Sequence, residues 1–309
     1  MTWLLKAFVQ RAIGFLPASE RLNYFFQKRI TKNLPINDDT LDEKIVLAAK
    51  RIGLFLKFSD IPLLDAHFLE FGAGWDLTGP LSMYALGAPK QTLLDITPHL
   101  RFELINNVLA RLRLREDHFK EITGRSPLPF PDNDVKSSKD LLQWFNIEYL
   151  APLDASQTGF SENSMDFVST NSTLEHIPAQ ELPPIMNESF RILKPGGLIC
   201  HLIDMKDHYS YFDHSISKYN FLKYSESAWK IYNTSLQYQN RLRISRYKAF
   251  IENAGFEIVY EDIDRASDKE LQELRSLALH SDFKNYFSEE EISAQIYRVV
   301  ARKPPKKND

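Results

Sequence analysis

The chain has 309 residues, of which 43% are hydrophobic and 26% charged, and its formal net charge is -3. This supplies enough apolar material for one large domain or two small ones, and the near-neutral balance argues against a dedicated nucleic-acid-binding protein. Cys200 is the only cysteine, which excludes disulfides within the chain and sites built from several cysteines. A single cysteine suits a reducing, cytoplasmic compartment.

The first 62 residues show a helical pattern. Apolar residues at three- and four-residue spacing predict helices over 21–30 and 42–58. Residues 1–16 predict an amphipathic helix without the cleavage site of a signal peptide. We expect residues 1–62 to form an N-terminal helical cap, with peripheral membrane contact through residues 1–16 as the alternative reading of that helix.

From residue 63 the pattern changes to short apolar runs that alternate with amphipathic segments, which predicts a parallel sheet with crossover helices. The expected strands are 68–71, 92–96, 147–150, 166–170, 198–203, 256–260 and 296–301, and the expected helices are 77–86, 100–112, 181–193 and 246–253.

Two stretches interrupt this alternation. Residues 113–145 are polar and contain several prolines, so we expect an insertion or mobile loop before a short helical segment over 141–145. Residues 205–243 are rich in aromatic side chains and predict an insertion that recognises substrate. The last residues, 303–309, are charged and are expected to form a flexible tail.

The most informative stretch lies at the end of the first predicted strand. The carboxylate of Glu70 is followed by Phe71, Gly72, Ala73 and Gly74, so the two glycines stand two residues apart. Glycine lets backbone approach a ligand closely and tolerates the positive φ of tight turns. The next helix also directs its N-terminal N–H groups toward this point. A nucleoside cofactor with an amino-acid tail can bind there.

Later strands end in matching polar residues. Asp95, with Ile96 after it, ends the second strand 25 residues after Glu70, where a carboxylate can accept hydrogen bonds from both ribose hydroxyls. Asp154 and Ala155 follow the third strand, where a carboxylate can accept from an adenine amino group. The fourth strand runs into the polar turn 169–177, and a Lys-Pro-Gly-Gly turn at 194–197 feeds the fifth strand.

These five elements, in this order, resemble the class I S-adenosylmethionine-dependent methyltransferases, notably the small-molecule, type 11-like branch, over roughly residues 65–302. The resemblance implies a doubly wound, Rossmann-like α/β fold. Its seven-stranded sheet would be mostly parallel with an antiparallel last strand, in a methyltransferase domain over residues 63–302.

The resemblance also implies S-adenosylmethionine as the cofactor and assigns its contacts. The methionine part would be held by the glycine turn, the ribose and adenine by the acids after strands two and three, and the methyl site by the turn after strand four. The residues so assigned are Glu70, Phe71, Gly72, Ala73, Gly74, Asp95, Ile96, Asp154, Ala155 and Asn171.

The glycine turn departs from the family at its third glycine, which is Asp76 here, after Trp75. The extra carboxylate makes contact with a phosphate implausible and suits a positively charged cofactor. Leu77 stands where a dinucleotide-binding GxGxxG loop needs a small residue, which weakens the rival hypothesis of a nicotinamide-dependent oxidoreductase. A catalytically silent binding protein that keeps the fold is the second alternative.

The expected activity is methyl transfer to a hydroxyl of a small molecule, either sugar-like or lipid-linked. The turn after strand four lacks the Asn-Pro-Pro-aromatic sequence that methylates amides and exocyclic amines. His208 and His176 are the predicted catalytic bases, because imidazole can take a proton near neutral pH. Glu175, together with these two histidines, would form only part of a metal shell, so no metal is predicted. The sequence does not indicate an oligomeric state.

Overall fold

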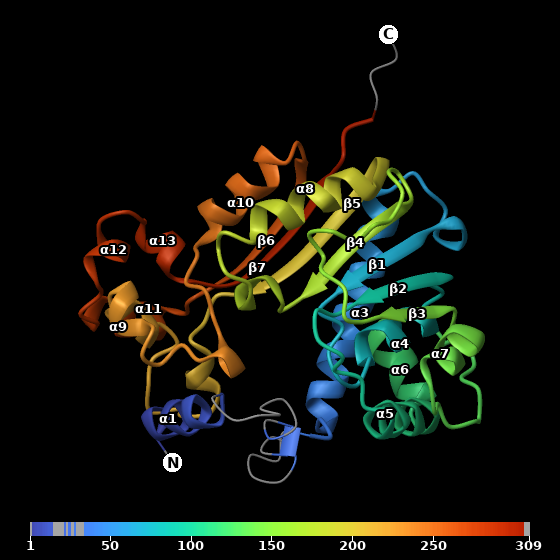
Figure 1. The fold of residues 1–309 in the computed structure, drawn as a ribbon, viewed down its shortest axis with the longest axis horizontal. Coiled ribbons are helices and arrows are strands. Elements are labelled where there is room, and N and C mark those ends of the chain that lie inside the picture. The colour runs from blue at the N-terminus through green and yellow to red at the C-terminus, as the bar shows by residue number, and fades with distance from the viewer. Residues whose placement is uncertain (1, 15–21, 23, 26–27, 29–33, 306–309) are drawn as a thin grey trace.

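The computed structural model describes residues 2–14, 22, 24–25, 28 and 34–305. Its seven strands form one sheet in the order β3-β2-β1-β4-β5-β7-β6, with helices on both faces (Figure 1). Six strands share one direction, and β7 runs antiparallel to its neighbours β5 and β6. The predicted Rossmann-like fold is therefore confirmed. The helix predicted over 21–30 falls mainly outside the described residues, as does most of the predicted tail.

The strands correspond closely to the apolar runs of the sequence. They are β1 His67–Phe71, β2 Lys90–Leu94, β3 Ile147–Leu150, β4 Met165–Asn171, β5 Leu193–Asp204, β6 Glu257–Arg265 and β7 Ala294–Arg302.

The described part of the chain also contains α-helices, of which α3 is the longest, and short 3-10 helices. The α-helices are α1 Trp3–Gly14, α3 Asp38–Phe58, α4 Thr78–Ala85, α5 Phe102–Leu114, α6 Glu116–Thr123, α7 Ser138–Phe145, α8 Leu182–Ile192, α9 Glu226–Trp229, α10 Ile244–Asn253, α11 Asp268–Ser276, α12 Ser281–Lys284 and α13 Glu289–Ile292. Short 3-10 helices are η1 Leu63–Asp65, η2 Leu174–His176, η3 His208–Tyr211, η4 Asn220–Lys223 and η5 Ser235–Gln237. None of the described helices is long and apolar enough to cross a membrane.

Side chains alternate between the two faces of the sheet, as the period of a strand requires. On one face Phe68 and Phe167 pack against Phe55 of α3, with ring centroids 5.0 and 5.5 Å from that of Phe55. On the other face Leu69 and Phe71 belong to the core formed with α8 and α10. Glu70 therefore points to the same face as Phe68, toward α3.

The polar stretch 113–145 contains two helices, α6 and α7, and is not a loop throughout. The reason is that several of its apolar side chains are buried, among them Phe119, Val135 and Phe145. Helix α7 begins with a capping box in which Ser137 and Asp140 satisfy each other's backbone N–H groups. Helix α6 was not predicted because the helical spacing of apolar residues is too weak a signal over so short a segment.

The aromatic segment after β5 forms a third core together with α1. Trp3 of α1 lies 5.4 Å from Tyr209 and 5.0 Å from Tyr232, measured between ring centroids. Many of the rings expected to recognise substrate are thus packed against one another and against helix α1. On the same helix Leu5 and Phe8 are exposed. Peripheral membrane contact through α1 stays a prediction.

A buried ion pair joins α3 to the tip of β1. Arg51 Nη1 lies 2.6 Å from Glu70 Oε2, and each side chain is only 7% exposed. Arg51 Nη1 also approaches Ser169 Oγ of β4 at 3.5 Å. Two charges at this depth are tolerated because each compensates the other. The pair fixes α3 on the face of the sheet opposite α8.

Replacing Arg51 by Met should leave the Glu70 carboxylate buried without a partner. We expect Arg51→Met to lower the free energy of unfolding by about 3–5 kcal/mol, measured by urea denaturation. Adding Glu70→Gln should recover part of this loss, because the uncompensated charge disappears. The exposed pair of Arg275 and Glu289 supplies the control, and Arg275→Met should leave stability unchanged. Equal stability of Arg51→Met and the parent would contradict a structural role for the pair.

Candidate functional site

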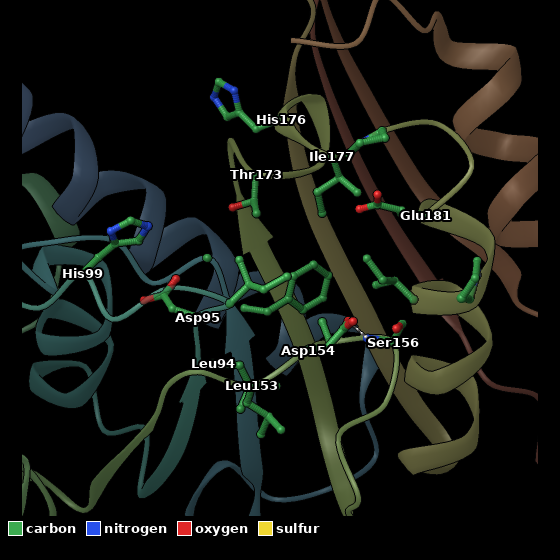
Figure 2. Close-up of a pocket in the computed structure, with 18 of the residues that line it drawn as sticks. Leu94, Asp95, His99, Leu153, Asp154, Ser156, Thr173, His176, Ile177 and Glu181 are labelled. Atoms are coloured by element: carbon green, nitrogen blue, oxygen red, sulfur yellow. Dashed lines mark hydrogen bonds between the residues drawn. The ribbon is translucent and has the colours of Figure 1, made fainter. Parts of the chain in front are cut away.

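A cavity of about 470 Å³ lies at the carboxyl ends of β1, β2 and β4. The strand order reverses between β1 and β4, because β2 follows β1 to one side and β4 lies on the other. In open α/β sheets this switch point is where ligands bind. Figure 2 shows most of the residues that line the cavity, which come from the ends of β1 and β2, from the loops after β3 and β4, and from the segment between η2 and α8. Its size suits a nucleoside or a metabolite.

The glycine turn forms one wall of this cavity. Gly72 has φ +77° and Gly74 has φ +76°, both in the region that favours glycine. The Gly72 N–H donates to the carbonyl of Leu94 over 2.9 Å, which ties the turn to the tip of β2. A Cβ atom added at Gly72 would lie 2.4 Å from Thr173 Cγ2, whereas one added at Gly74 would meet nothing within 4 Å. The turn thus brings bare backbone next to the loop after β4.

Asp95 lies in the cavity beside the glycine turn. Its carboxylate accepts hydrogen bonds from Tyr149 Oη, at 3.0 Å, and from the backbone N–H groups of Gly74 and Ala73. Burial of the side chain, which is 5% exposed, raises the pKa of Asp95 to about 7 in spite of these donors. The site therefore holds a carboxylate that is only partly ionised at neutral pH and gains from further hydrogen-bond donors.

The end of β3 contributes the opposite wall. Asp154 and Ala155 line the cavity, together with Leu153. Asp154 Oδ1 accepts a hydrogen bond from the Ser156 N–H over 2.7 Å, which fixes the side chain in a tight turn. Ile96 also lines the cavity and is 70% exposed, so it presents an apolar surface at the mouth. A flat base between Leu153 and Ile96 would lie beside a carboxylate.

The structure thus brings together seven of the ten predicted cofactor residues in one cavity. These are Phe71, Gly72, Gly74, Asp95, Ile96, Asp154 and Ala155.

Glu70, Ala73 and Asn171 do not line this cavity. The alternation of β1 turns Glu70 toward α3, where it pairs with Arg51. Asn171 follows Phe167 at an even spacing on β4, so it also faces α3 and lines a second cavity of about 20 Å³ beside Arg51. Ala73 contributes its backbone N–H to Asp95.

Several lining residues were missed by the sequence reasoning. His99 lies in the loop after β2, and Glu181 lies just before α8 (Figure 2). The loop after a parallel strand is the usual place for ligand contacts, which was a usable signal for His99. Thr173 also lines the cavity and belongs to the turn 169–177 that was predicted to form the methyl site. Tyr149 supports Asp95 from within β3, and only the register of β3 with β2 reveals this contact.

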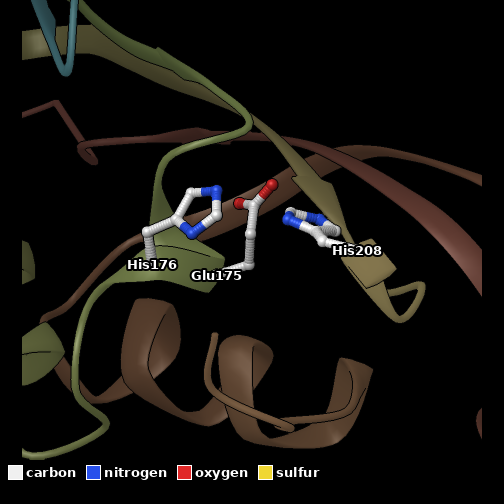
Figure 3. A group of neighbouring side chains, drawn as sticks. All are labelled: Glu175, His176 and His208. Atoms are coloured by element: carbon white, nitrogen blue, oxygen red, sulfur yellow. The ribbon is translucent and has the colours of Figure 1, made fainter. Parts of the chain in front are cut away.

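The two predicted bases, His176 and His208, lie beside each other at one end of the cavity. Their ring centroids are 4.9 Å apart, and Glu175 lies with them (Figure 3). His176 lines the cavity, whereas His208 lies outside its lining. Burial lowers the pKa of His208 well below the usual value of a histidine. Burial also raises the pKa of Glu175 well above the usual value of a glutamate. The structure therefore brings the two histidines together at one end of the cavity, where only His176 contributes to the lining.

Comparison with protein families gives one match. A family model described as a methyltransferase domain matches residues 132–201, which run from the loop before α7 into β5. The match contains Asp154, Asn171 and His176 but excludes β1 and β2. It confirms the predicted resemblance over this segment. A search of curated protein sequences finds no match to the chain.

Solved structures with a similar arrangement include an S-adenosylmethionine-dependent methyltransferase from Methanosarcina mazei, with 14% identity, 82% of this chain and 98% of that chain covered, and a TM-score of 0.49. Geranyl diphosphate C-methyltransferase from Streptomyces coelicolor has 11% identity, coverages of 89% and 88%, and a TM-score of 0.47. Phosphoethanolamine N-methyltransferase 2 from Haemonchus contortus has 15% identity, coverages of 91% and 60%, and a TM-score of 0.45. At these values the three structures identify neither the substrate nor the methylated atom of this chain.

The substitution Gly72→Ala tests the close contact between the glycine turn and Thr173. Alanine at either Gly72 or Gly74 should cost about 1–2 kcal/mol of stability, because both have positive φ. Gly72→Ala should lose about 1–3 kcal/mol more, because its Cβ meets Thr173. Thermal or urea unfolding measures both variants. Adding Thr173→Ala should recover part of the extra loss, and equal stability of the two single variants would contradict the close contact.

Proposed function

We propose that this chain, with its methyltransferase-domain match over residues 132–201, binds S-adenosylmethionine in the cavity at the strand tips and transfers the methyl group to a hydroxyl of a small molecule. The observation that carries the proposal is the meeting of the glycine turn, Asp95 and Asp154 around one cavity. Each supplies the chemistry that one part of the cofactor requires.

The cofactor's ribose would lie against Asp95. Its two hydroxyls are donors, and the Asp95 carboxylate is an acceptor aimed into the cavity from the end of β2. The adenine would then lie between Ile96 and Leu153, with its amino group toward Asp154. The amino-acid end would lie along the glycine turn at Gly74, where an added Cβ atom would meet nothing within 4 Å. This arrangement leaves the sulfonium between the glycine turn and the loop after β4.

The acceptor would enter from the side of His176. In the transfer the sulfur–methyl bond breaks as an oxygen–methyl bond forms, and the hydroxyl proton must leave. The sulfonium is itself a strong electrophile, so the protein mainly positions the hydroxyl and assists loss of its proton. His176 on the cavity wall and His208 beside it are the residues that we assign to this end of the reaction.

A hydroxyl acceptor is preferred because the chain from Asn171 reads Asn-Ser-Thr-Leu and lacks the Asn-Pro-Pro-aromatic sequence that holds an exocyclic amine. Tyr211 and Asp204 lie close to His208, and Tyr211 Oη donates to the Asp204 carboxylate. This mixture of ring and polar groups suits an acceptor with several hydroxyls. We propose a sugar-like or lipid-linked small molecule as the acceptor class.

Calorimetry with S-adenosylhomocysteine tests the cofactor site. We expect the parent to bind it and Asp95→Ala to bind at least tenfold more weakly, because the ribose loses its acceptor. Affinity for the parent should rise by about tenfold from pH 6 to pH 8, since the Asp95 pKa of about 7 means that the carboxylate ionises over this range and the bound ribose favours the ionised form. Asp95→Asn should flatten this dependence.

Asp65→Ala is the matched control, because Asp65 is an exposed acid at the amino end of β1, away from the cavity. Its affinity should equal that of the parent. Binding of NAD⁺ without binding of S-adenosylhomocysteine would overturn the proposal in favour of an oxidoreductase. Equal affinity of Asp95→Ala and the parent would remove Asp95 from the ribose site.

A further inference from the structure

Three potential metal ligands meet beside the cavity, from segments that are far apart in the sequence. Glu175 and His176 lie on η2, which follows β4, and His208 begins η3, which follows β5. One ligand atom of each lies within 4.8 Å of the others (Figure 3). The carboxylate of Glu175 lies between the two imidazole rings in this view.

Two polar side-chain atoms of this cluster are buried without a hydrogen-bond partner. Glu175 Oε2 and His208 Nε2 have no hydrogen-bond partner within the described part of the chain. Glu175 is only 1% exposed, so the free oxygen is not solvated by bulk water. A buried polar atom without a partner is costly, and it indicates a missing ion or ligand when several such atoms converge.

The third ligand has a fixed tautomer. His176 Nδ1 lies 2.6 Å from the carbonyl of Tyr238, so Nδ1 carries the proton and donates it to that oxygen. His176 Nε2 is then left with a lone pair. A backbone carbonyl bound to the other ring nitrogen is the usual support of a metal-bound histidine.

Hydrogen bonds hold the other two ligands in place. Glu175 Oε1 accepts from the Asp204 N–H over 3.2 Å, which leaves Oε2 turned away from the backbone. The His208 N–H donates to Gln239 Oε1 over 3.2 Å. Asn240 donates through Nδ2 to the carbonyls of Leu174 and Ile177, both at 2.8 Å, and so fixes η2. The donor atoms are therefore held in place by the surrounding segment 238–240.

We propose that Glu175, His176 and His208 bind one divalent transition-metal ion. Two imidazole nitrogens and one carboxylate are the donor set of zinc and non-haem iron sites with open positions, whereas magnesium and calcium prefer oxygen ligands. The Asp204 carboxylate lies 3.7 Å from His208 Nε2, close to the cluster. The ammonium of Lys206 lies 3.7 Å from the same carboxylate, so the negative charge of Asp204 and the positive charge of Lys206 largely offset each other. This proposal differs from the prediction of no metal that was made from the sequence.

The metal site would deepen the proposed function, on which this consequence rests. His176 lines the cavity, so an open position of the ion would face the space assigned to the acceptor. A hydroxyl bound to a divalent ion loses its proton more readily. The two histidines would then act as ligands, the hydroxyl proton would pass to solvent, and the oxygen would take the methyl group as the sulfur–methyl bond breaks.

Metal binding can be measured on the full chain without an affinity tag. After treatment with EDTA and its removal, Zn²⁺ is titrated by calorimetry, and Co²⁺ is titrated by its visible absorption. We expect one equivalent of each ion to bind, with Zn²⁺ displacing Co²⁺. Glu175→Gln and His208→Ala should each weaken binding at least tenfold. His214→Ala is the matched control, because His214 is exposed and outside the cluster, and its affinity should equal that of the parent.

His176 is exposed, so His176→Ala should fold even if the variants of the buried ligands do not. If Glu175→Gln or His208→Ala fails to fold, weakened binding by a folded His176→Ala still supports the site. Substoichiometric binding by the parent, or equal affinity in these variants, would overturn it. Binding of S-adenosylhomocysteine is measured in parallel with EDTA present. If S-adenosylhomocysteine binds neither with EDTA nor without it, the proposed function alone is overturned. If S-adenosylhomocysteine binds but the parent binds no metal ion, the metal site alone is overturned.

Discussion

The hydrogen bond from the Gly72 amide to the Leu94 carbonyl ties the loop after β1 to the tip of β2. The backbone amides of Ala73 and Gly74 then reach the carboxylate of Asp95, so the turn and the acid hold each other in place. This closure forms the floor of the cavity before any ligand is present. It requires positive φ at both glycines, and it requires that no Cβ atom at Gly72 separate the turn from Thr173.

The alternation of side chains along the strands then decides what the cavity contains. Phe71 faces the cavity and Glu70 faces α3, where Arg51 compensates its charge. The same alternation on β4 sends Asn171 to the α3 face. Most other lining residues belong to the loops after the strands, where the chain is free of the strand period, and Pro184 and Ile185 come from α8. The Arg51–Glu70 pair thus lies on the α3 face of the sheet, whereas Asp95 and Asp154 line the cavity.

Much of the fold could be predicted from the sequence, because the strands are short apolar runs separated by amphipathic helices. Seven of the ten cofactor residues predicted from the sequence line the cavity. They could be predicted because the ends of the strands in a parallel sheet converge. Glu70 and Asn171 were misplaced because a motif counts positions and ignores the two-residue period of the strand. The meeting of Glu175 with His208 needed the register of β4 with β5, which brings Asn171 opposite Leu202.

A crystal structure with S-adenosylhomocysteine tests the central claim most directly. The account predicts that the ribose hydroxyls lie within hydrogen-bonding distance of the Asp95 carboxylate, that the adenine lies beside Leu153 and Asp154, and that the sulfur faces the side of the cavity where His176 lies. A nucleoside bound at another edge of the sheet, or a sulfur directed away from His176 with no open space before it, would contradict the account.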